Sequence, residues 1–168
     1  MDRLYRFSPI KTEEELLEAI KHIHFGCFAL CKNSLGKILP ASGNVGVFCH
    51  YDEEYQRLLE FQKELTNLPQ SPTQKYLPLK KPIIIPSNGD IPETVYTHLY
   101  IRKPDPYRSH VGDTDFEMSA KEYKELKEKI TEGKVKYARN PSHPTHDMVE
   151  LFNPDSDVLG YISDHQLL

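Results

Sequence analysis

Residues 97–116 form the part of the sequence that is richest in chemically capable side chains. The stretch holds two histidines, two tyrosines, two arginines, one lysine and three aspartates. Guanidinium groups bind oxyanions, phenol rings flank flat groups, and imidazole groups exchange protons near neutral pH. We therefore expect a functional site of this protein to be built on this stretch.

The first half of the stretch is typical of a strand over 95–102. Because strand side chains alternate between two faces, one face should enter the core while the other carries a ladder of tyrosine, histidine and arginine. Arginine can hold an oxyanion while tyrosines flank a flat group, so we expect an anionic, partly planar ligand. An ordinary solvated face is the alternative interpretation. The predicted ligand-binding residues are Tyr96, His98, Tyr100 and Arg102 on the strand and Arg108 in the turn after it.

The second half is predicted to return as a strand near 111–118. Its alternation places Asp113, Asp115 and Glu117 on one face, where three carboxylates repel one another and need a cation, basic neighbours or open water. The functional interpretation is a divalent metal site or a set of acid/base groups, and the structural interpretation is a solvated acidic face. The candidate metal ligands are His110, Asp113, Asp115 and Glu150.

The composition restricts the class of protein. A length of 168 residues fits one domain. No apolar run approaches the roughly 18 residues of a membrane span, and the net charge of −4 argues against general nucleic-acid binding. The N-terminal residues lack the apolar segment of a signal peptide, and the three cysteines fit a reducing compartment, so we expect a cytoplasmic protein with free, buried thiols.

Caps and apolar periodicity predict an alternation of helices and strands. Thr12 and Ser119 each precede a glutamate three residues later, which is the capping-box pattern. The predicted helices lie near 12–23, 52–66 and 119–132. The predicted strands lie over 3–10, 24–31, 44–51, 83–85, 95–102, 111–118, 135–139, 147–152 and 158–162. Because strand pairs alternate with single helices, we predict an α+β fold with a largely antiparallel sheet and about three packed helices.

The same periodicity predicts which apolar side chains enter the core. Each of them lies on the apolar side of its helix or in an apolar strand. The predicted core residues are Leu16, Ile20, Phe28, Val47, Leu58, Leu99, Ile101, Leu126, Leu151 and Leu159.

The segment over 67–94 differs in kind from the rest of the chain. Six of the thirteen prolines lie between Leu68 and Thr94, and this density excludes a helix. The segment is too apolar for a disordered linker. We therefore predict an ordered proline-rich crossover between the two halves of a single domain over 1–168, placed to cover the ladder on the strand that follows it.

The segment Val111–Ser163 has the predicted order β-α-β-β-β and ends in a hairpin with the turn FNPDSD. In this order and turn it resembles one module of the vicinal-oxygen-chelate (glyoxalase-type) proteins. The family places a histidine or glutamate in the first strand of the module and a glutamate in the last. His110 would stand for the first ligand, whereas the last strand carries no acid and Glu150 lies one strand earlier.

Two functions stay open at this point. The favoured one is a small module, without catalysis, that binds a protein or a small anionic ligand through the Tyr/His/Arg face. The alternative is a metal-supported enzyme, either glyoxalase-like or a hydrolase, that acts on a small or phosphorylated substrate. No set of residues in the sequence alone meets the geometric requirements of a catalytic site, which is why binding is favoured.

Overall fold

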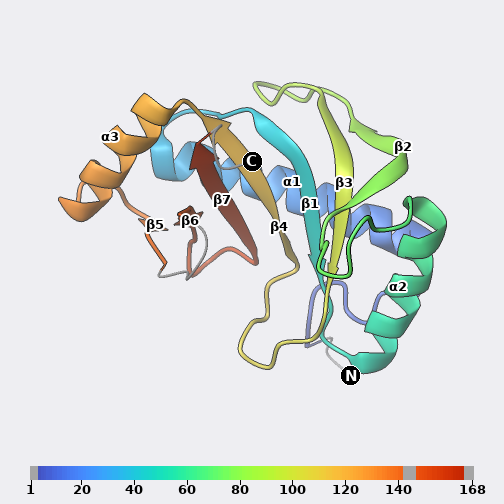
Figure 1. The fold of residues 1–168 in the computed structure, drawn as a ribbon. Helices are drawn as coiled ribbons and strands as arrows, with labels where there is room; N and C mark the ends of the chain where they lie inside the picture. Colours follow the sequence, from blue (N-terminus) through green and yellow to red (C-terminus); the bar gives the residue numbers. More distant parts are fainter. Residues whose placement is uncertain (1–3, 142–146, 165–168) are drawn as a thin grey trace.

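A single sheet of seven strands forms the centre of the protein within residues 4–141 and 147–164, the part of the chain that the computed structural model describes. The strands are β1 (Ala41–Phe48), β2 (Leu77–Ile85), β3 (Thr94–Arg102), β4 (Gly112–Met118), β5 (Ala138–Arg139), β6 (Val149–Leu151) and β7 (Val158–Asp164). They lie side by side in the order β2-β3-β1-β4-β7-β6-β5 (Figure 1). Four of the six pairings are antiparallel, and β1–β3 and β4–β7 are parallel. The predicted α+β fold with a largely antiparallel sheet is confirmed.

The sheet consists of two halves with the same plan, joined where β1 and β4 pair antiparallel. Each half begins with a strand and a helix, α2 (Asp52–Leu65) or α3 (Ala120–Thr131), and ends with a strand parallel to its first. The second half, from β4 to β7, is the β-α-β-β-β segment identified in the sequence. The first half, from β1 to β3, repeats that order with one strand fewer.

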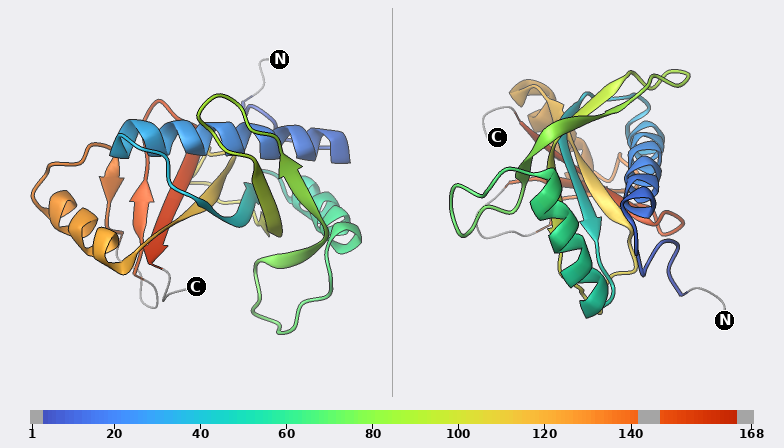
Figure 2. Two further views of the ribbon diagram at one scale, coloured as in Figure 1. Left: turned by 90° about the horizontal axis from the view of Figure 1, so that it is seen from above. Right: turned by 90° about the vertical axis from the view of Figure 1, so that its right-hand side faces the viewer.

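The helix α1 (Glu13–Leu35) lies across one face of the sheet and contacts β1, β4, β6 and β7 (Figures 1 and 2). It begins at Thr12, whose hydroxyl accepts from the amide of Glu15, and ends at Gly36 in the left-handed conformation. The strand predicted over 24–31 is wrong, because these residues continue α1. A short apolar run fits a buried strand and a buried helix equally well by periodicity alone.

The other two helices have the predicted positions. Ser119 and Glu122 form the predicted capping box at the start of α3. The strand predicted over 3–10 is wrong in its described part, from residue 4 onward, which forms no strand. There the carboxylate of Glu54 accepts from the amide of Ile10 at 2.5 Å and from the hydroxyl of Ser8 at 3.0 Å. A side chain, rather than a neighbouring strand, therefore holds this segment.

The strands β3 and β4 follow each other in the chain but do not pair, because β1 lies between them. At the end of β1 the amide of Phe48 donates to the carbonyl of Val111, and the amide of Cys49 donates to the carbonyl of Arg102. The connection over 103–111 therefore passes over the end of β1. This arrangement brings Arg102 and the residues of the connection close to β4 and β7.

All ten predicted core residues are buried. The burial pattern of β3, however, changes phase within the strand: Tyr96, Leu99 and Ile101 are buried, whereas Val95 is 42% exposed. A backbone irregularity lies at this point, since the β2–β3 register shifts between Pro78 and Ile83, the partners of His98 and Tyr96. An irregularity of the pairing between strands explains why side chains along β3 do not alternate strictly between the two faces.

The three cysteines are buried and free. Cys27 donates to the carbonyl of Leu159 at 3.2 Å, and burial raises the pKa of the Cys31 thiol to about 11. Such thiols pack as small apolar groups.

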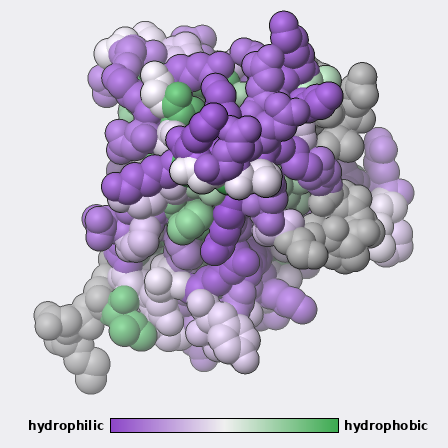
Figure 3. Space-filling model, turned by 90° about the vertical axis from the view of Figure 1, so that its left-hand side faces the viewer, coloured by the Kyte–Doolittle hydropathy of each residue, from purple (hydrophilic) through white to green (hydrophobic). Residues whose placement is uncertain are grey.

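The end of the molecule formed by α3, β5 and β6 is covered mostly by hydrophilic residues (Figure 3). Among the described residues, no helix has the length and apolar character needed to cross a membrane.

Replacing Leu99 by alanine tests the face assignment of β3. Its side chain is fully buried, so Leu99→Ala should lower the free energy of unfolding by about 2–5 kcal/mol in denaturant melts. Val95→Ala, on the exposed part of the same strand, is the matched control and should cost far less. Equal losses for the two variants would contradict the change of phase.

Candidate functional site

The alternation of side chains along β4 shows which face of the sheet is open. The ring of Phe116 packs against Phe28 of α1 with centroids 5.2 Å apart, and Thr114 lies on the same side. Asp113 and Asp115 therefore project from the opposite face. A cavity of about 600 Å³ opens there. Its polar and aromatic lining includes Asn44, Phe48, Tyr76, Tyr100, Arg102, Arg108, Asp113, Asp115, Glu150 and Tyr161.

Asp113 is a largely enclosed acid of this pocket, with only 6% of its surface exposed. Its Oδ1 has no hydrogen-bond partner among the described residues. That oxygen lies over Gly46, where a Cβ atom would come within 2.2 Å of it. Burial, and after it the charge of Asp115, raises the pKa of Asp113 well above its usual value. Asp113 is therefore a carboxyl group that holds its proton far more tightly than an exposed aspartate does.

Asp115 lies two residues along the same face of β4 and is half-buried. It accepts a hydrogen bond from the amide of Asn44 at 3.2 Å. Burial raises the pKa of Asp115 to about 6, and the bond from Asn44 opposes the rise. Two neighbouring carboxyls with different proton affinities can serve as an acid and a base toward a bound molecule.

Two arginines stand beside the acids. Arg102, at the end of β3, donates to Asp105 at 2.6 Å and lies 4.4 Å above the ring centroid of Phe48. Arg108, in the connection to β4, has its Nε 3.9 Å from Asp105 and donates from Nη1 to Tyr161 at 3.5 Å. The shared carboxylate of Asp105 holds both guanidinium groups near the pocket, where their remaining N–H groups can bind an oxyanion.

Three tyrosines surround the pocket. The rings of Tyr76 and Tyr100 lie 5.2 Å apart at a tilt of 49°, and Tyr161 donates to Glu150 at 2.9 Å. Burial raises the pKa of all three phenols, so each stays a neutral hydrogen-bonding group. Glu150 is buried and also accepts from Nε of Arg139 at 2.7 Å. Its carboxylate is therefore engaged within the protein.

The structure brings together three of the five predicted ligand-binding residues: Tyr100, Arg102 and Arg108 line the pocket. Tyr96 lies on the other face of the sheet, where its hydroxyl contacts His24 of α1 at 2.8 Å. His98 is half-buried beside Thr97 and does not line the pocket. The change of phase in β3 separates Tyr96 from the rest of the ladder.

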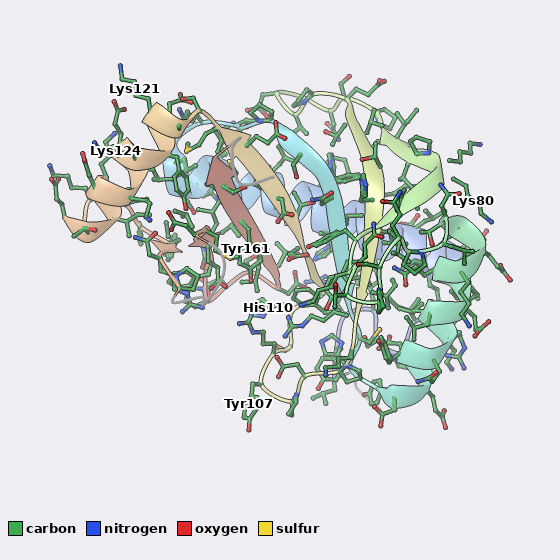
Figure 4. The ribbon with its side chains drawn as sticks, in the orientation of Figure 1. Lys80, Tyr107, His110, Lys121, Lys124 and Tyr161 are labelled. Atoms are coloured by element: carbon green, nitrogen blue, oxygen red, sulfur yellow. The ribbon has the colours of Figure 1, made fainter. Side chains whose placement is uncertain are left out.

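Of the four candidate metal ligands, Asp113, Asp115 and Glu150 line the pocket and His110 does not. His110 belongs to the connection between β3 and β4, whereas Tyr161 projects from β7 (Figure 4). Within residues 4–141 and 147–164, no group of three or more histidine, cysteine, aspartate or glutamate side chains is arranged to hold a metal ion. The interpretation of Asp113 as part of a solvated acidic face is wrong, since this carboxyl is buried.

Sequence reasoning missed Asn44, Tyr76 and Tyr161. Tyr161 alternates with buried residues along β7 and faces Asp115 across the β4–β7 pairing, so a correct strand order would have found it. Tyr76 directly precedes β2 within the proline-rich crossover, and Lys75 and Tyr76 bring that segment to the pocket. No local pattern marks Tyr76, because its place depends on how the crossover folds back.

The sequence matches no family model and no curated protein. One solved structure, described as "Structural Genomics, Protein EC4020", is similar over 99% of this chain and 96% of its own, with a TM-score of 0.59 at 7% identity. Two structures of Streptomyces coelicolor methylmalonyl-CoA epimerase variants in complex with 2-nitronate-propionyl-CoA cover 75% of this chain and 97% of their own. Their TM-scores are 0.36, at 14% and 16% identity. The first likeness shows a shared fold alone, and the other two are too distant in shape to bear on the site.

The shifted pKa of Asp115 predicts a pH dependence of stability. Since the folded protein holds this proton up to about pH 6 and the unfolded chain loses it near 3.8, this residue's contribution to stability falls as pH rises between those values. Asp115→Asn removes the effect. Relative to wild type, the variant should therefore gain stability between about pH 4 and about pH 7 in denaturant melts.

Asp90→Asn is the matched control for this measurement. A bond from Lys32 lowers the pKa of the exposed Asp90 below its ordinary value of 3.8, so Asp90→Asn should differ from wild type by a nearly constant amount between about pH 4 and about pH 7. A difference between Asp115→Asn and wild type that is the same at both pH values would contradict the assigned pKa.

Proposed function

We propose that this protein binds a small anionic ligand in the pocket, with the oxyanion on Arg102 and Arg108 and a flat part between the tyrosines. The observation that carries the proposal is the convergence of two guanidinium groups and three phenol rings on one cavity. A volume of about 600 Å³ lies within the range of roughly 300–1,000 Å³ that is usual for small-molecule sites. We place this binding activity in the cytoplasm.

The arginines are suited to this role by their setting. Arg102 is held by Asp105 and by the ring of Phe48, which fixes the guanidinium plane and lowers the entropy lost on binding. Arg108 lies between Asp105 and Tyr161, and the shared contact with Asp105 keeps the two guanidinium groups near each other in the lining of the pocket. Guanidinium groups pair with carboxylate or phosphate oxygens through two parallel hydrogen bonds.

The tyrosines favour a ligand with a flat group over a simple inorganic ion. Tyr76 and Tyr100 meet at a tilt across one side of the pocket, and Tyr161 stands on β7. Phenol rings interact with a flat ligand through offset or edge-to-face contacts. A small molecule fits this convergent arrangement better than a protein surface, since the polar groups gather in a cavity rather than along an exposed strand.

The metal-supported enzyme is the second candidate function. It is favoured by Asp113 and Asp115, two carboxyls of different proton affinity that face the same cavity. Metal analysis of the purified protein separates the two candidates: stoichiometric zinc, manganese or iron supports the enzyme, and a metal-free protein whose melting divalent ions do not change counts against it.

Anion binding can be measured with phenyl phosphate and benzoate as probes and benzyl alcohol as their neutral counterpart. Wild-type protein should bind the two anions more tightly than the alcohol in calorimetric titrations. Arg102→Gln and Arg108→Gln should each weaken anion binding by about 10-fold to 100-fold, the loss expected for a charge-assisted hydrogen bond.

Lys80→Gln is the matched control, since it removes the same charge from an exposed side chain of β2 at the margin of the molecule (Figure 4). This variant should bind the anions as wild type does. If both arginine variants also retain wild-type anion affinity, or if benzyl alcohol binds as well as benzoate, the proposed function is wrong.

A further inference from the structure

The floor of the pocket carries two carboxyl groups, Asp113 and Asp115, that make no ion pair with a cationic side chain of the described residues. Asp113 lines the cavity with only 6% of its surface exposed, and its Oδ1, which lies over Gly46, has no hydrogen-bond partner among the described residues. Asp115 receives one neutral hydrogen bond, from Asn44. A buried carboxyl that lacks hydrogen bonds costs stability, so its place in a pocket indicates that a ligand group completes it.

The arginines of the same pocket do not neutralise this floor. Arg102 and Arg108 act on Asp113 only through space, while their short contacts go to Asp105 and Tyr161. The two guanidinium groups and the two carboxyls therefore line one cavity without an ion pair between them. A ligand that matches both regions must carry charges of both signs.

The surroundings of the two carboxyls suit an ammonium group. The rings of Tyr76, Tyr100 and Tyr161 border the same cavity, and aromatic rings attract a cation placed over their faces. An ammonium group has three donors and no acceptor, so the carboxyl oxygens of Asp113 and Asp115 supply what it needs. It would relieve both the desolvation of Asp113 and the repulsion within the pair.

We propose that the ligand of this pocket is a zwitterion, a small molecule whose ammonium group binds Asp113 and Asp115 while its oxyanion binds Arg102 and Arg108. The inference rests on the proposed function and names its ligand class. Amino acids and amino-phosphates with a flat side group have this chemistry. An ammonium group fits the floor better than magnesium or calcium, which take six or more oxygen ligands where the pocket floor supplies two carboxyls.

Calorimetric titration with two matched series of probes tests the inference. The first series is phenylalanine, hydrocinnamate and phenethylamine, and the second is para-aminomethylbenzoate, para-toluate and benzylamine. Within each series the compounds share one skeleton and carry both charges, the anion alone or the cation alone. In at least one series the zwitterion should bind about 10-fold or more tightly than the anion, because its ammonium group binds the carboxyls while its oxyanion binds the arginines.

Asp113→Asn and Asp115→Asn assign the gain to the carboxyls. Each variant should reduce the advantage of the zwitterion over its anion to less than about threefold. Binding of the anion should stay equal in Asp113→Asn, because that carboxyl holds its proton, and should improve in Asp115→Asn, because a repelling charge is gone. Asp90→Asn, which removes an exposed carboxylate, should leave both affinities unchanged. Thermal melts establish that each variant is folded, and two independent carboxyl variants keep the test open if one of them fails to fold.

The outcomes separate this inference from the function on which it rests. If hydrocinnamate and para-toluate bind wild type as tightly as their zwitterions, or if the carboxyl variants keep the full advantage, the zwitterion assignment is overturned and anion binding stands. If no compound of either series binds, both the assignment and the proposed function are overturned.

Discussion

The close approach of β1 and β4 is the constraint on which the rest of the structure depends. Two glycines permit it: a Cβ atom at Gly112 would lie 2.1 Å from the carbonyl oxygen of Gly46 and 2.4 Å from Cδ1 of Ile23 in α1. A Cβ atom at Gly46 would lie 2.2 Å from Oδ1 of Asp113 on the other face. The same pairing thus lets α1 pack closely on one side and leaves room for a buried carboxyl on the other.

The two halves of the sheet meet along this pairing, and the pocket takes residues from both. Tyr100 and Arg102 come from the first half, and Asp113, Asp115 and Tyr161 come from the second. The face turned toward α1 is covered by Phe28 and its apolar neighbours, so the pocket lies on the opposite face. A seam between two similar halves is a place where groups distant in the sequence converge.

Local signals in the sequence were sufficient for most of the fold. The caps before α1 and α3 and the alternation in β4 predict the right elements, because each depends on neighbours in the chain. The apolar run over 24–31 was misread as a strand, since burial on a sheet hides the helical period. The strand order was not accessible, because the insertion of β1 between β3 and β4 is set by long-range pairing.

The site can be predicted only in part, because local signals identify some of its residues and long-range packing positions the others. Arg102, Asp113 and Asp115 were found from residue type and alternation, and they do face one cavity. Strict alternation places Tyr96 on the wrong face, because the phase of β3 changes where its register with β2 shifts. Tyr76 reaches the pocket through the crossover, whose path depends on packing rather than on local sequence.

The central claim is that the pocket floor is a pair of carboxyls held in a desolvated state until a ligand completes it. Carbon NMR of the aspartate side-chain carboxyls in the free protein, assigned with Asp113→Asn and Asp115→Asn, measures this most directly. The account predicts that Asp115 titrates at about pH 6 and that Asp113 keeps its proton to a still higher pH, because burial and the charge of its neighbour oppose ionisation. Titration of both carboxyls near the ordinary value of 3.8 would contradict it.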